Sequence, residues 1–292
     1  MLRSLLAASL LCILLPATPA AAGAAPRTDA DLPSLPELGG GHQVLVRYTP
    51  GSLERAAQIQ QRAVALAAEA DAAFGGRHSL QIYVLSRFEW EEARLRNPYG
   101  FAEVTAGGAL LLPAFADDES VRRWRDRLGG AVPPPSARAV VASGQEAGAL
   151  AAADAVGYAD LARWLVEQHR PDVDSPWLGE LLAHLLTRVA LGRGFPEDLH
   201  AADTVFAGLV RGGGGDGARP LAAWRPGLPL AEQLWWDGEF GRGAAALVAD
   251  RGLSRTRRLL EATLRKRKPL AAAMLFEKAP AFAGWRQVGF AP

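Results

Sequence analysis

The chain has 292 residues, a formal net charge of +1 at pH 7 and 49% hydrophobic residues. Its length suits one large domain or two small ones, and a charge this close to neutral gives no reason to expect a nucleic-acid partner. The single cysteine, Cys12, lies in the N-terminal apolar run, so the chain after it can form neither a disulfide nor a thiolate metal site.

The N-terminus has the pattern of a cleavable secretory signal peptide. Arg3 supplies the positive charge, Leu5 to Leu15 form an apolar run too short to span a membrane, and small residues around Ala22 offer cleavage sites. We expect residues 1–22 to be removed, the protein to be secreted or periplasmic, and no transmembrane segment to remain. An uncleaved anchor is the alternative. The excess of arginine over lysine and the abundant alanine indicate a bacterial gene.

The first half of the mature chain mixes strand and helix patterns. Residues 23–41, rich in Ala, Pro, Asp and Gly, predict a linker. Alternating or wholly apolar runs predict strands over 42–48, 80–85, 102–105 and 109–112. Helical patterns lie between them, over 53–74, 88–95 and 117–128. Together these segments predict an α/β subdomain over residues 42–144.

The second half, residues 145–292, reads as helical. Apolar residues recur at helical spacing near 146–169, 177–191, 198–211, 230–250 and 254–265. The sequence therefore predicts an α+β fold, in which a small N-terminal β-sheet with helices is followed by a mainly α-helical half.

Two helical segments, 157–169 and 175–185, resemble the gluzincin class of zinc metallopeptidases. In that class one helix carries His-Glu-x-x-His, and a later helix carries a glutamate ligand in a Trp-Leu-x-Glu context, which here is Trp177-Leu178-Gly179-Glu180. The segments 97–100 and 235–240 are also similar to the regions that flank the site in some secreted bacterial members. The resemblance implies a zincin-like fold with a cleft for an extended peptide.

The chain departs from this motif at the reacting positions. One alignment sets His-Glu-x-x-His over residues 165–169, where Leu165 and Val166 replace a ligand and the general base and only His169 remains. A second alignment, over residues 158–162, keeps no histidine. Because leucine and valine can neither bind zinc nor move a proton, we expect that catalysis is lost and that no cofactor is bound. The candidate cleft positions are Leu165, Val166, His169, Trp177, Glu180 and His184.

A rearranged zinc site is the alternative. Glu180 and His184 are four residues apart on one predicted helix, and His169 together with them would supply three ligands. The competing interpretation is that Glu180, His184, Thr187 and Arg188 form a solvated polar stripe. The remaining histidines, His42, His78 and His200, are expected at the surface.

A basic stretch near the C-terminus could contact an anionic lipid or cell-wall surface, or could be an ordinary solvated helix and turn. It comprises Arg255, Arg257, Arg258, Arg265, Lys266, Arg267 and Lys268.

These patterns favour a secreted, metallopeptidase-like pseudoenzyme that binds a peptide or a partner protein in the old substrate cleft. An active zinc-dependent peptidase with a rearranged site (His169, Glu180, His184) is one alternative, and a structural envelope protein is the other.

Overall fold

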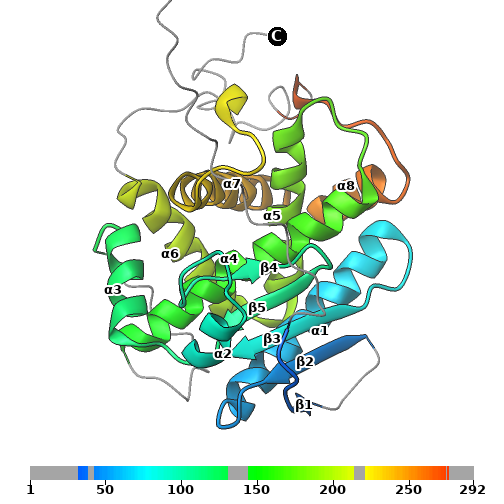
Figure 1. Cartoon of the computed structure of the whole chain (residues 1–292). Helices are drawn as coiled ribbons and strands as arrows, with labels where there is room; N and C mark the ends of the chain where they lie inside the picture. The colour runs from blue at the N-terminus through cyan, green and yellow to red at the C-terminus, as the bar shows by residue number, and fades with distance from the viewer. Residues whose placement is uncertain (1–31, 39–42, 131–143, 214–220, 274, 276–292) are drawn as a thin grey trace, which may run out of the picture.

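The computed structural model describes residues 32–38, 43–130, 144–213, 221–273 and 275 (Figure 1). The predicted signal peptide and His42 lie outside the described residues. In the described part of the chain, no helix combines the length and the apolar character needed to cross a membrane.

A five-stranded mixed sheet forms the N-terminal part of the fold. Its order is β1-β2-β3-β5-β4. The three central strands, β2 (Val44–Tyr48), β3 (Leu80–Leu85) and β5 (Ala109–Pro113), run parallel, while β1 (Glu37–Leu38) and β4 (Glu103–Val104) pair antiparallel at the two edges. The predicted strands are confirmed, and β1 is an addition, formed by two residues of the segment expected to be a linker.

The sheet buries both faces, and its side chains alternate between two apolar clusters. Val46, Ile82 and Leu110 belong to the main core on one face. Tyr83 and Leu111, each one position further along its strand, belong to a smaller cluster on the opposite face. This two-sided burial explains why the strands read as nearly continuous apolar runs.

The helices make up the rest of the fold, and the predicted α+β class is confirmed. They are α1 (Leu53–Phe74), α2 (Arg87–Glu92), α3 (Asp118–Arg127), α4 (Gln145–His169), α5 (Pro176–Gly194), α6 (Pro196–Gly212), α7 (Leu230–Arg251) and α8 (Leu253–Leu264), with a short 3₁₀ turn at Leu221–Ala223. Helices α1 and α4 contact the sheet, while α5 lies among α1, α4, α7 and α8 (Figure 1).

The central position of α5 overturns one expectation from the sequence. Glu180, His184 and Thr187 are only 3%, 3% and 6% exposed, so the prediction of a solvated polar stripe is wrong. The helix is surrounded by other helices rather than lying on the surface, and its polar side chains must therefore find partners inside the protein.

A glycine sets how closely α4 approaches the sheet. A Cβ atom at Gly157 would lie 2.8 Å from Leu112 Cδ2 and 3.0 Å from Ala102 Cβ. Both distances are shorter than an ordinary contact between carbon atoms, so any other residue at this position would push α4 away from the sheet. The close packing brings the following turns of α4 against the edge strand β4, which α4 also contacts. The face of α4 next to β4 is where the site lies.

Candidate functional site

One face of α4 borders a groove next to the edge strand. Asp160, Arg163, Trp164 and Glu167 follow the three- and four-residue spacing that places side chains on one helical face. They line a cavity of about 420 Å³ together with residues of the β4 segment and of the turn and helix at α7, namely Arg96, Asn97, Glu103, Val104, Thr105, Gly227, Leu228, Leu230 and Gln233. We call this cavity the groove.

The groove continues inward into a smaller cavity. This inner space, of about 100 Å³, shares Arg163, Glu167 and Gln233 with the groove and reaches Glu180 on α5 and Asp237 on α7. The smaller cavity is also lined by the exposed Arg225 and Pro226, and it places the buried carboxylates of α5 and α7 next to the groove.

Arg163 is the centre of these charged side chains. Its guanidinium donates from Nη1 to Asp160, from Nε to Glu180 and from Nη2 to Asp237. The three carboxylates come from α4, α5 and α7, so a single side chain connects three helices. Only 16% of the Arg163 side chain is exposed, and Glu180 and Asp237 are 3% and 1% exposed. We call Arg163 and its three carboxylate partners the arginine cluster.

Two further polar groups complete the surroundings of the cluster. Gln233 Nε2 donates to Asp160 Oδ1 at 3.4 Å, and His184 Nε2 lies 3.6 Å from Asp237 Oδ1, which is longer than a hydrogen bond. The His184 ring packs edge-on against Phe206, with centroids 5.0 Å apart. In the described structure, His184 Nε2 and Asp237 Oδ2 are buried without a hydrogen-bond partner.

Burial sets the protonation of the cluster. It raises the pKa of Asp160 to about 7 and the pKa of Glu180 to about 7, against the attraction of Arg163. Burial would also raise the pKa of Asp237, but Arg163 and His184 outweigh it and hold that pKa below its ordinary value. The pKa of His184 is lowered by burial, so its ring is neutral near pH 7. One buried cation thus faces three acids, and two of them retain protons close to neutral pH.

The zinc site that the resemblance implies does not fit these residues. Glu180, which matches the third ligand of the gluzincins, accepts a hydrogen bond from a guanidinium, a group with no lone pair for a metal. The residues of α4 that line the inner cavity with Glu180 are Arg163 and Glu167. In neither of the two sequence alignments does a reacting position of the motif fall on Arg163 or Glu167.

The predicted site residues are not brought together. Leu165, Val166 and Trp177 are at most 3% exposed and belong to the main apolar core. His169 stacks on Phe74 at the end of α4. Of the six predicted positions, only Glu180 lines the groove or its inner cavity.

The trio His169, Glu180 and His184 does not form a metal centre in the described structure. Among the described residues, no group of three or more His, Cys, Asp or Glu side chains could hold a metal ion. The sequence analysis missed Asp160 and Arg163, although an Asp–Arg pair three residues apart, flanked by apolar residues on a predicted helix, is a signal that could have indicated them.

The edge strand turns backbone groups toward the groove. Thr105 N–H donates to Ala109 O, which makes residues 105 and 109 a hydrogen-bonded pair of the antiparallel ladder. Hydrogen-bonded and non-hydrogen-bonded pairs alternate, so Val104, opposite Leu110, directs its N–H and C=O away from β5 and toward the open edge. Val104 is also a lining residue of the groove.

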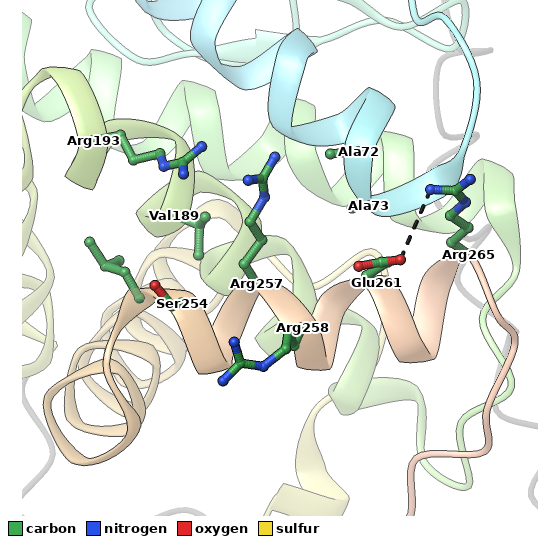
Figure 2. Close-up of a pocket in the computed structure, with 10 residues that line it drawn as sticks. Ala72, Ala73, Val189, Arg193, Ser254, Arg257, Arg258, Glu261 and Arg265 are labelled. Atoms are coloured by element: carbon green, nitrogen blue, oxygen red, sulfur yellow. Dashed lines mark ion pairs between the residues drawn. The ribbon is translucent and has the colours of Figure 1, made fainter.

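A separate, third cavity of about 610 Å³ lies between α1, α5 and α8, and four arginines line it. Arg193 and Arg257 reach from α5 and α8 toward the end of α1, and Arg258 points away from them (Figure 2). Glu69, 8% exposed in its side chain, pairs with Arg193 at 3.1 Å and with Arg257 at 2.9 Å. Of the predicted basic stretch, Arg257, Arg258 and Arg265 line this cavity.

Comparison of the chain with protein-family models, with curated proteins and with solved structures finds no match.

Replacing Arg163 should destabilise the protein strongly. In Arg163→Met, three buried acids lose their common cation, and removing one partner of a buried ion pair costs about 3–5 kcal/mol. The stability lost in Arg163→Met should become smaller at lower pH, because the buried carboxylates take up protons and no longer need a cation. Urea unfolding at about pH 8 and about pH 5 measures both effects. Arg242→Met is the matched control, because Arg242 pairs with Glu239 on the same helix while 55% of its side chain is exposed, and it should contribute less than about 1 kcal/mol. Equal losses in the two variants would contradict the role given to Arg163.

The stability of the protein should fall as the pH rises from about 5 to about 8. Glu180 and Asp160 keep protons in the native state up to about pH 7, whereas the unfolded chain releases them near its ordinary carboxyl pKa values, so deprotonation favours unfolding. Glu180→Gln removes one of the two titrations, and the variant should lose less stability over that interval. Unfolding midpoints across this range are the measurement, and identical slopes for variant and wild type would contradict the raised pKa of Glu180.

Proposed function

We propose that this chain is a secreted, metallopeptidase-like protein that has lost zinc and catalysis and that binds an extended peptide segment in the groove. The observation that carries the proposal is Val104 of the edge strand β4, which lines the groove and directs its N–H and C=O away from β5. The carbonyl groups of Ala102 and Ala106 on either side of it accept hydrogen bonds from Asn97 Nδ2 and Trp164 Nε1. The signal-like N-terminal sequence supports export, and the Trp-Leu-x-Glu element of α5 supports the metallopeptidase-like origin.

An extended peptide suits this groove for two reasons. An unpaired strand edge offers N–H and C=O groups to another strand, and adding a strand in this way is a recurrent mode of peptide recognition. The opposite wall supplies side-chain contacts, with the Trp164 ring and the carboxylate of Glu167 among the lining groups. The groove volume of about 420 Å³ also lies in the range of ligand sites.

The arginine cluster supports a binding role rather than hydrolysis. A zinc peptidase needs three metal ligands with an open position and a base beside the bound water. Here the glutamate that resembles the third ligand is paired with Arg163, and the aligned positions Leu165 and Val166 lie in the core. A rearranged peptidase would need to release Glu180 from Arg163.

The edge-strand proposal can be tested by removing a single N–H group. Val104→Pro deletes the outward donor without breaking a ladder hydrogen bond to β5, since Val104 belongs to a non-hydrogen-bonded pair. A randomised ten-residue peptide library displayed on phage would be selected on the wild-type protein, and the affinity of the best peptide measured by fluorescence anisotropy. We expect Val104→Pro to weaken binding about tenfold, as expected for a lost hydrogen bond.

Val104→Thr is the matched control, because it keeps both the β-branched shape and the N–H. Its affinity for the selected peptide should stay close to that of wild type. Unaltered binding by Val104→Pro, or a selection that yields no peptide, would contradict the proposal.

We also propose that the arginine-lined cavity on α8 contacts an anionic surface. Glu69 pairs with Arg193 and Arg257, and Glu261 pairs with Arg265, so two carboxylates face the four arginines and leave an excess of positive charge at the cavity. Basic residues near an anionic membrane each contribute about 1 kcal/mol to the free energy of binding.

The double variant Arg258→Ala, Arg265→Ala should therefore reduce co-sedimentation with phosphatidylglycerol vesicles more than tenfold. Arg125→Ala, on α3, should have little effect. Equal binding by the double variant and wild type, or wild-type binding to neutral phosphatidylcholine vesicles, would contradict this contact.

A further inference from the structure

Two histidines that are remote in the sequence meet at the end of α4. His78 lies in the segment between α1 and β3, and His169 is the last residue of α4; their Nε2 atoms are 3.2 Å apart. Phe74 stacks on His169 with ring centroids 4.0 Å apart and fixes that ring from one side. Both residues are partly buried, which corrects the expectation that His78 is a surface histidine.

Hydrogen bonds at the other ring nitrogens define the tautomers. His78 Nδ1 lies 2.9 Å from Asp71 Oδ1, and His169 Nδ1 lies 2.9 Å from the carbonyl oxygen of Leu165. A carboxylate and a carbonyl only accept hydrogen bonds, so each neutral ring must carry its proton on Nδ1. Both Nε2 atoms then present lone pairs.

Two Nε2 atoms that both carry lone pairs repel at 3.2 Å unless a cation lies between them, either a proton shared by the two rings or a metal ion bound by both. Zinc–imidazole bonds are about 2.0–2.1 Å long, which separates two nitrogen ligands by roughly 2.9 Å at a right angle and roughly 3.3 Å at the tetrahedral angle. The observed separation of the Nε2 atoms falls between these values. From this geometry we propose that His78 and His169 bind a divalent transition-metal cation, with water completing the coordination.

The second layer of contacts is that of a metal site. Asp71 Oδ1 also accepts from the backbone N–H of His78 at 2.8 Å, and Asp71 Oδ2 accepts from Gln43 Nε2 at 2.6 Å. A carboxylate or carbonyl behind each metal-binding imidazole fixes the tautomer and raises the basicity of the ligand. Here each of the two rings has such a partner.

The chemistry of the donors defines the cation. Imidazole suits Zn²⁺, Ni²⁺ and Cu²⁺, and the affinity for a given site is highest for Cu²⁺ and low for Mn²⁺. With two protein ligands the site is open, so its cation exchanges with solution and is not a structural zinc. Neither histidine lines the groove, so the metal site is independent of the proposed peptide binding.

The test uses the mature, untagged protein and Zn²⁺ or Cu²⁺ salts as probes. Calorimetric titration should show one Zn²⁺ per chain, and the electron paramagnetic resonance spectrum of one added Cu²⁺ should show coupling to two imidazole nitrogens. His78→Gln and His169→Gln should each lose this binding, and Asp71→Asn should weaken it about 10- to 100-fold. His200→Gln is the control, because His200 is exposed on α6 and should not alter the titration.

A second measurement separates loss of the site from loss of the fold. Zn²⁺ should raise the unfolding temperature of the wild type and leave that of His169→Gln unchanged, while circular dichroism reports whether the variant is folded. A wild-type Cu²⁺ spectrum without imidazole coupling, or Zn²⁺ binding that survives both histidine substitutions, would overturn the proposal.

Discussion

The buried guanidinium of Arg163 is the interaction on which the helical half of this protein depends. It joins carboxylates from α4, α5 and α7, so a single buried side chain connects three helices. Bringing three acids into the interior is unfavourable unless a cation and hydrogen bonds compensate. With only one cation available, two of the acids compensate instead by holding protons close to neutral pH.

This constraint links the interior to the groove. Arg163 lines the groove on one side and holds Glu180 and Asp237 on the other, so the arginine cluster borders the groove. In the gluzincins that α5 resembles, the corresponding glutamate holds zinc. Under the proposed metallopeptidase-like origin, the guanidinium of Arg163 takes the place of the metal beside this glutamate and supplies no Lewis acid. That exchange is the physical basis for the proposed pseudoenzyme.

The sequence predicts the fold far better than the site. The strands at 80–85 and 109–113 and the helix over 53–74 follow from short-range patterns of apolar residues, which do not depend on the rest of the fold. The site depends on which face of α4 meets α5. An alignment on His169 selects the face that carries Leu165, whereas Gly157 packs α4 on the sheet so that Asp160 and Arg163 face the groove.

The contact between His78 and His169 is not predictable from the sequence for a similar reason. The pairing of His78 with His169 joins the end of α1 to the end of α4, a contact across the fold that no local pattern contains. The sequence therefore predicts His78 as an ordinary turn residue and places His169 in a cleft whose other residues lie elsewhere in the structure. The sequence does not predict the burial of Glu180 either, because the polar side chains of α5 suggest a surface helix, whereas α5 contacts five other helices.

The central claim is that Arg163, and not a metal, neutralises Glu180. The most direct measurement is the zinc content and casein hydrolysis of chelator-free protein carrying His78→Gln, which removes the proposed two-histidine site. The account predicts no stoichiometric zinc and no hydrolysis. One zinc per chain, lost together with a hydrolytic activity on the further change Glu180→Gln, would contradict it.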